Sequence, residues 1–211
     1  MNNCNTISMQ KTQRTAAFLR NTHTMTSVAL LTAISYALAF FEFPVPLSPA
    51  FAKMDLSDFP ALVGAMTLGP WAGVAVEFVK NLLGLFTTST GGVGELANFL
   101  MGGAFSFVAG VVYYKGKQRA WFACLLGSVA MAVTAALANY FILLPLFETF
   151  MPLDALIASF AEFIPFIHTK LDVVLLNAIP FNLLKGLGIS VVTLLLFPRL
   201  LPVLRGRKTS A

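Results

Sequence analysis

Charged side chains are scarce in this sequence. They make up 11% of its 211 residues, whereas hydrophobic residues make up 57% and the mean hydropathy is +0.80. Such a composition lies outside the range of soluble globular domains. Several apolar runs reach the roughly 17 to 25 residues that cross a bilayer as a helix. No segment shows the alternation of a membrane β-barrel strand, so the sequence predicts an all-α membrane protein.

Catalytic and metal-binding motifs are also missing. The sequence has no His-Glu-x-x-His, Cys-x-x-Cys, Gly-x-Ser-x-Gly or Walker A motif. Its histidines, His23 and His168, are far apart, and its cysteines, Cys4 and Cys124, are expected on the reducing cytoplasmic side. The glycine-rich residues 91–94 resemble a phosphate-binding loop only superficially and are expected to form a tight turn. We therefore expect no enzyme, metal site, disulfide or cofactor.

The net charge of +5 does not indicate nucleic-acid binding, because the basic residues gather at the ends of the apolar runs. The expected spans are residues 25–42, 56–68, 70–86, 94–114, 120–147 and 171–197. With both termini in the cytoplasm, the inner segments carry basic residues and no acidic ones: Lys11, Arg14, Arg20, Lys115, Lys117, Arg119, Arg199, Arg205, Arg207 and Lys208. This positive-inside pattern predicts a compact bundle of six transmembrane helices in the bacterial cytoplasmic membrane.

Three segments follow from these boundaries: a cytoplasmic tail over 1–24, the six-helix domain over 25–200, and a basic cytoplasmic tail over 201–211. The stretch 56–86 could instead be one long span. Gly69-Pro70 interrupts it, however, and a merged span would place the basic residues 115–119 outside. The first apolar run is too long for the usual core of a cleaved signal peptide and is expected to remain as a helix.

Polar side chains inside the spans are few, and each is costly in hydrocarbon unless it is paired or lines a cavity. Their spacing places several of them on common helix faces. The third span carries Glu77, Lys80 and Asn81, the fourth Glu95 and Asn98, the fifth Asn139, and the sixth Asn177, Asn182 and Lys185. Their depths predict a pocket that opens on the outer side, with phenylalanines as apolar walls.

A buried structural network is the alternative explanation, in which Glu77 and Lys80 neutralise each other and the asparagines bridge helices. Lys185 favours the pocket, because it has no acidic residue within a helical turn and needs a partner from another helix or from a ligand. Asn139 and Asn182 can both donate and accept hydrogen bonds. They would suit a neutral ring edge with alternating carbonyl and N–H groups.

Two further segments fit a binding function. Residues 43–53 contain Pro44, Pro46 and Pro49, which exclude a helix, and the apolar Leu47 and Phe51 suit a lid over the pocket mouth. A plain connector at the membrane surface fits equally well.

In the first helix, small residues repeat every four positions: Ala29, Ala33 and Ala37. They form a smooth stripe that lets another helix approach closely. That helix could belong to the same bundle or to a partner protein.

Five sequence blocks together carry a family resemblance: residues 55–61, 69–73, 77–83, 94–99 and 177–186. With them, roughly residues 25–200 resemble the substrate-binding S components of energy-coupling factor (ECF) vitamin transporters, most of all the riboflavin-specific branch. The resemblance implies six helices, capture of riboflavin from outside, and closure of the site by the loop between the first two helices. It also implies a transmembrane T subunit and two cytoplasmic ATPases as partners, with the alanine stripe as the docking surface.

The resemblance assigns roles to the polar residues as well. Asn139, Asn182 and Lys185 would face the polar edge of the isoalloxazine ring. The remaining residues would bind the ribityl chain or brace the pocket: Glu77, Lys80, Asn81, Glu95 and Asn98. The alternatives are an S component for another vitamin, an ion-coupled transporter using Glu77 or Glu95 as proton site, and a small intramembrane enzyme. The absence of inverted repeats and of paired catalytic groups counts against the last two.

Overall fold

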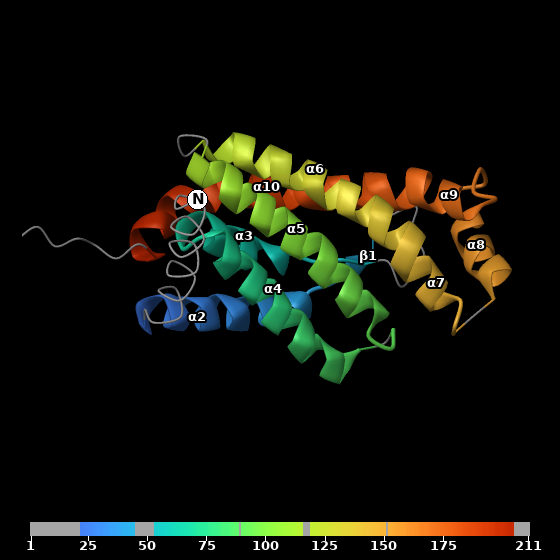
Figure 1. Ribbon diagram of the computed structural model, residues 1–211, viewed down its shortest axis with the longest axis horizontal. Helices are drawn as coiled ribbons and strands as arrows, with labels where there is room; N and C mark the ends of the chain where they lie inside the picture. Colours follow the sequence, from blue (N-terminus) through green and yellow to red (C-terminus); the bar gives the residue numbers. More distant parts are fainter. Residues whose placement is uncertain (1–21, 45–52, 89, 116–118, 151, 205–211) are drawn as a thin grey trace, which may run out of the picture.

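The structure is a computed structural model that describes residues 22–44, 53–88, 90–115, 119–150 and 152–204. Its long helices run side by side along the longest axis of the molecule (Figure 1). They are α5 (Val93–Lys115), α6 (Ala120–Ala138) and α10 (Ile179–Leu204). Within the described residues, three stretches, counted with their helical extensions, are long and apolar enough to cross a membrane: Val93–Lys115, Ala120–Phe147 and Lys170–Pro202.

Two of these long stretches contain a π-helical segment. Helix α6 continues through η2 (Asn139–Leu143) into α7 (Leu144–Phe147), and α10 is preceded by α9 (Lys170–Val173) and η3 (Val174–Ala178). A proline lies two residues after each π segment, at Pro145 and Pro180. Each proline lacks the N–H that would bond to the carbonyl four residues earlier, and its ring crowds that carbonyl. A wider π turn relieves this conflict.

Shorter elements complete the described chain. They are α2 (Thr22–Ala39), β1 (Phe43–Pro44), β2 (Lys53–Met54), α3 (Asp58–Thr67), α4 (Pro70–Gly84), η1 (Leu85–Thr87) and α8 (Leu153–Ala161). The two strands pair antiparallel, with Phe43 opposite Met54, and so form the stem of the segment between α2 and α3. Helix α8 is an element that the sequence analysis did not include.

Helices α3 and α4 form a tight antiparallel hairpin. The predicted break at Gly69-Pro70 is confirmed: Gly69 has φ 128°, which favours glycine, and Pro70 is the first residue of α4. The two helices touch closely at Gly73, where an added Cβ would lie 2.6 Å from the Cβ of Ala65. The hairpin therefore places the start of α3 beside the second half of α4.

The helix ends gather at two opposite ends of the bundle. The first turn of α2 lies at one end of the bundle, together with the C-terminal ends of α5 and α10 and the start of α6, and α8 and α9 lie at the other end (Figure 1). The Tyr114 hydroxyl donates a hydrogen bond to the Thr67 carbonyl oxygen at 2.9 Å, which ties the α3–α4 hairpin to the first of these ends. Large apolar side chains such as Phe141 and Leu195 are exposed on the outer surface, where lipid would cover them. The count of six spans stays a prediction.

Candidate functional site

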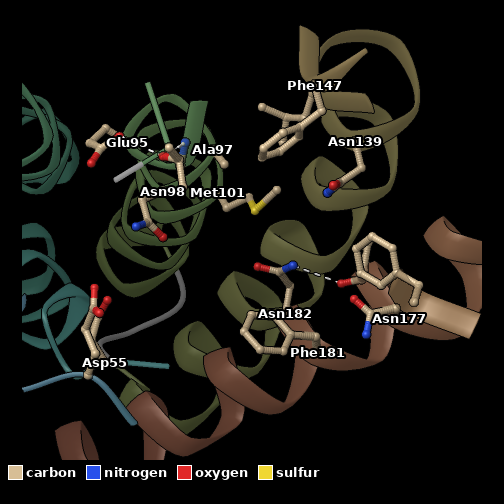
Figure 2. A pocket seen from close by; sticks show the side chains of 16 residues that line it. Asp55, Glu95, Ala97, Asn98, Met101, Asn139, Phe147, Asn177, Phe181 and Asn182 are labelled. Atoms are coloured by element: carbon tan, nitrogen blue, oxygen red, sulfur yellow. Dashed lines mark hydrogen bonds between the residues drawn. The ribbon is translucent and has the colours of Figure 1, made fainter. Parts of the chain in front are cut away.

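A cavity of about 530 Å³ lies between α5, the two π segments and the stem of the β1–β2 loop (Figure 2). Its volume is within the roughly 300 to 1,000 Å³ of small-molecule sites. One side is formed by Glu95, Asn98 and Asp55, and the facing side by the asparagines of α6–η2 and η3–α10. Polar groups from several helices therefore converge on one cavity.

The π segments bring two amide side chains to the cavity. Asn139 begins η2, and Asn182 follows η3 by one helical turn. Asn139 donates from Nδ2 to the Ala135 carbonyl oxygen at 2.8 Å, and Asn182 donates to the Ala178 carbonyl oxygen at 2.9 Å. Each amide thus uses one N–H within its own helix. The Oδ1 acceptor and the second N–H of each can serve a ligand.

Apolar side chains form the rest of the wall. They come from α5, η2, α7, α8 and α10: Met101, Leu143, Phe147, Phe160 and Phe181. Phe160 belongs to α8, whose residues Leu156 and Phe160 pack with Leu144 and Val174 in a small core of their own. Amides opposite aromatic walls suit a flat ligand with one polar edge.

A second cavity of about 320 Å³ adjoins the first. The two share Glu42, Asp55, Glu95 and Asn98, and the smaller one extends to Lys80 and Asn81 on α4. The predicted site residues are therefore divided between the two cavities and the region behind them. Asn139, Asn182, Glu95 and Asn98 line the larger cavity, and Lys80 and Asn81 line the smaller one.

Glu77 and Lys185 lie behind both cavities, in a buried ionic cluster. Lys80 Nζ is 2.7 Å from Asp58 Oδ1 and 2.7 Å from Glu77 Oε2. Lys185 Nζ is 3.0 Å from Asp58 Oδ2 and 3.8 Å from Asp55 Oδ1. All five side chains are buried. Asp58 bridges the two ammonium groups and so joins α3, α4 and α10.

In this cluster the nearest acidic partner of Lys185 is Asp58. Asp58 belongs to another helix, α3. Glu77 and Lys80 form an ion pair, as the alternative of a buried structural network expects. Lys185 still contacts the cavity wall, because its Nζ lies 3.4 Å from Asn98 Oδ1. Sequence reasoning did not assign Asp55 and Asp58 to the site. The available signal was two carboxylates at the start of an apolar span, within the first of the family blocks.

The predicted lid residues Leu47 and Phe51 lie outside the described residues. The stem does place both ends of their segment at the site, since Glu42 precedes β1, Asp55 follows β2, and both line the two cavities.

The alanine stripe lies on the outer surface of α2. Ala29, Ala33 and Ala37 are all exposed, whereas Leu31 and Ser35 on the opposite face are buried. The Ser35 hydroxyl donates a hydrogen bond to the Ser57 carbonyl oxygen. The stripe therefore faces away from its own bundle.

Comparison with known proteins agrees with this architecture. The family model described as "ECF transporter, substrate-specific component" matches residues 23–197. The riboflavin transporter RibU of Staphylococcus aureus (strain TCH60) is 32% identical over 203 residues, covering 95% of this chain and 96% of that protein. The riboflavin transporter FmnP of Bacillus subtilis (strain 168) is 32% identical over 188 residues, covering 87% of this chain and 94% of the relative.

A solved structure is similar as well. It is described as "Structure and mechanism of the S component of a bacterial ECF transporter", with a TM-score of 0.67 and 32% identity over 87% of this chain and 98% of the other. The matched region contains two of the three long apolar stretches, most of the third, and all of the residues that line the larger cavity. The protein is therefore a multi-pass protein of the cytoplasmic membrane with a transport role rather than an enzymatic one. The chain belongs to the substrate-specific components of ECF transporters.

Proposed function

We propose that this protein is the riboflavin-binding S component of an ECF-type importer. It captures riboflavin on the outer side and delivers it to the cytoplasm when a transmembrane T subunit and two ATPase subunits energise it. The observation that carries the proposal is the pair Asn139 and Asn182, which present amide groups to a cavity walled by aromatic side chains. The relatives named as riboflavin transporters support the choice of ligand.

Riboflavin has the chemistry that this cavity can bind. Its flat ring system has an apolar end and an edge of alternating carbonyl and N–H groups, and its ribityl chain carries hydroxyl groups. The ring would lie against Phe147, Phe160 and Phe181 with its polar edge toward Asn139 and Asn182. The ribityl hydroxyls would then lie toward the wall formed by Glu95 and Asn98, which offers charged and neutral acceptors. Lys80 and Asn81 would line the adjoining smaller cavity, and Glu77 and Lys185 would support the wall from behind.

Transport requires a path and a partner. In the proposed topology six helical segments cross the membrane, with both termini in the cytoplasm, and the segment containing Leu47 and Phe51 closes the outer mouth. The exposed Ala29, Ala33 and Ala37 would dock on the T subunit, because small side chains allow close helix approach. ATP hydrolysis belongs to the partners, since the sequence has no Walker A motif.

The direct test is to purify the protein in detergent and record the absorbance spectrum of any bound small molecule. A bound flavin absorbs visible light, and titration of the ligand-free protein with riboflavin should quench flavin fluorescence with one-to-one stoichiometry. A folded protein that leaves flavin fluorescence unchanged, or that carries a different vitamin, would contradict the proposal.

A further inference from the structure

Residues 149–169 leave the bundle after α7 and return to it at α9, and we call them the α8 excursion. An ion pair between Glu148 and Lys170 joins the residues just before and just after this excursion. At the return, the Asp172 carboxylate accepts a hydrogen bond from the Thr169 N–H at 2.9 Å, and the Asp172 N–H donates to Thr169 Oγ1 at 3.2 Å. This reciprocal cap fixes the start of α9. The excursion therefore has a closed and well-defined base.

Helix α8 runs across the end of the bundle, whereas α5, α6 and α10 run along it (Figure 1). The long helices belong to the stretches that can cross a membrane, so a helix laid across their ends lies close to the plane of the membrane surface. Its 9 residues extend about 14 Å, half of the hydrocarbon layer, which is too short to cross. The position of α8 is that of a helix at the interface between lipid and water.

The two faces of α8 differ in polarity. Asp154, Ala158 and Glu162 follow one another at intervals of four residues on one face, and all three are exposed. Leu156 and Phe160 lie on the opposite face and are buried against the bundle. Phe160 also lines the larger cavity. The carboxylate face is therefore directed to water, and the apolar face forms part of the cavity wall.

The phenylalanines that flank α8 are exposed. Phe150 precedes the helix and is 65% exposed, and Phe163 and Phe166 follow it at 41% and 79%. None of the three is among the described residues that line the larger cavity. Helix α9 begins a few residues later and exposes Leu171, which belongs to a stretch that can cross the membrane. The flanking phenylalanines thus continue the apolar surface that lipid covers on the long helices.

The charge of the excursion indicates which part of the lipid it contacts. Residues 149–169 contain no lysine or arginine, and Asp154 and Glu162 are acidic. Helices that bind anionic headgroups do so through lysine and arginine near the membrane surface. Without them, binding to a bilayer must come from the burial of apolar area. The partner that suits the exposed phenylalanines is the acyl-chain region just beneath the headgroups.

We infer that the α8 excursion is a membrane-binding element. Phe150, Phe163 and Phe166 enter the acyl-chain boundary of the outer leaflet, while Asp154 and Glu162 stay in water. Lipid thereby supports one wall of the larger cavity, because α8 carries Phe160 on its bundle-facing side. The inference rests on the topology given in the proposed function and not on the identity of the ligand.

The test uses the full chain in vesicles of phosphatidylcholine whose acyl chains carry bromine, which quenches tryptophan on contact. Trp71→Phe and Trp121→Phe remove both natural tryptophans, which are 59% and 58% exposed, and Phe166→Trp then adds a single reporter. Brominated lipid should abolish most of its fluorescence, and the aqueous quencher acrylamide should have little effect. Ala158→Trp, on the carboxylate face, is the matched control and should respond in the opposite way.

Phe150→Trp provides a second reporter at the other end of α8 and should respond as Phe166→Trp does. About 1 M salt or added phosphatidylglycerol should change neither response, because the contact is apolar. Thermal unfolding identifies the folded variants.

Reporters that respond to acrylamide as Ala158→Trp does, and not to brominated lipid, would overturn the inference. Shielding from both quenchers would show that protein, such as a second copy of this chain, covers the phenylalanines, and would overturn it as well. Quenching by brominated lipid together with protection of Asp154→Cys from an impermeant thiol reagent in intact cells would overturn the assignment to the outer leaflet. Flavin binding by the unmodified chain is measured separately, so the proposed ligand can stand or fall independently.

Discussion

Lys185 Nζ lies 3.0 Å from Asp58 Oδ2, and this ion pair joins the first half of α10 to the first residue of α3. Both side chains are almost fully buried. Because Asp58 also holds Lys80, one carboxylate links three helices behind the cavity. Removing one member of a buried ion pair leaves the other charge desolvated and without its partner.

Lys185→Met should therefore destabilise the ligand-free protein. The methionine keeps most of the apolar stem but leaves Asp58 with Lys80 alone, so the free energy of unfolding should fall by about 3 to 5 kcal/mol. Thermal unfolding in detergent, without flavin, measures this change. Lys170→Met is the matched control: Lys170 pairs with Glu148, both are about one-third exposed, and its loss should cost at most about 1 kcal/mol. A higher melting temperature for Lys185→Met would show that the ion pair is not structural.

Asn182→Leu should weaken riboflavin binding without unfolding the protein. Toward the described part of the chain, the Asn182 side chain donates a hydrogen bond to the Ala178 carbonyl of its own helix, so the loss of this bond costs little stability. A ligand group left unpaired against leucine should cost about 1 to 3 kcal/mol, or roughly five- to 150-fold in affinity. Fluorescence quenching measures the affinity. Leu184→Ala, at an exposed position on the same helix, is the control and should bind normally. Equal affinities for the two variants would exclude Asn182 from the site.

Ala33→Trp should separate binding from transport. Ala33 is exposed on α2, so an indole there points away from the bundle and leaves the cavity intact. It should abolish co-purification with a T subunit and cellular riboflavin uptake, because the partner helix can no longer approach closely. Leu195→Trp, at a position on α10 that is 70% exposed, should retain both. Lost flavin binding with retained T-subunit association would place the stripe inside a packed core instead.

The proposed topology can be tested by thiol labelling in intact cells. In a background with Cys4 and Cys124 replaced, a cysteine at Lys115 should be protected from an impermeant reagent, and one at Asp154 should react. Lys115 ends α5 and Asp154 belongs to α8, and the C-terminal end of α5 and helix α8 lie at opposite ends of the bundle (Figure 1). Labelling at Lys115 and protection at Asp154 would invert the assignment of the termini.

Local sequence features predicted much of the fold. The apolar runs, the basic connections and the break at Gly69-Pro70 each depend on neighbouring residues, and so they can be recognised without coordinates. Asn139 and Asn182 could likewise be chosen as candidate site residues from the sequence, since an asparagine within an apolar span is recognisable without knowledge of its contacts.

The ionic cluster depends on contacts between distant segments. Asp58 and Lys185 are 127 residues apart in the chain, and the packing of α10 against α3 brings them together. The position of α8 at the cavity could not be predicted from the sequence either, because its apolar run is too short to be recognised as a membrane-crossing helix. The π turns before Pro145 and Pro180 likewise required the backbone to be seen, since proline can also kink or end a helix.

The brevity of α3 also bears on how the chain enters the membrane. Its 10 residues extend about 15 Å, half of the roughly 30 Å hydrocarbon layer, and it begins with a carboxylate. Alone, α3 would leave Asp58 in lipid without a counterion. Its insertion must therefore be a joint event with α4, which supplies Lys80 and, through the contact at Gly73, the surface against which α3 packs. The second cation that pairs with Asp58 is Lys185, which is synthesised more than a hundred residues later. The start of α3 therefore reaches its final environment only once α10 has joined the bundle.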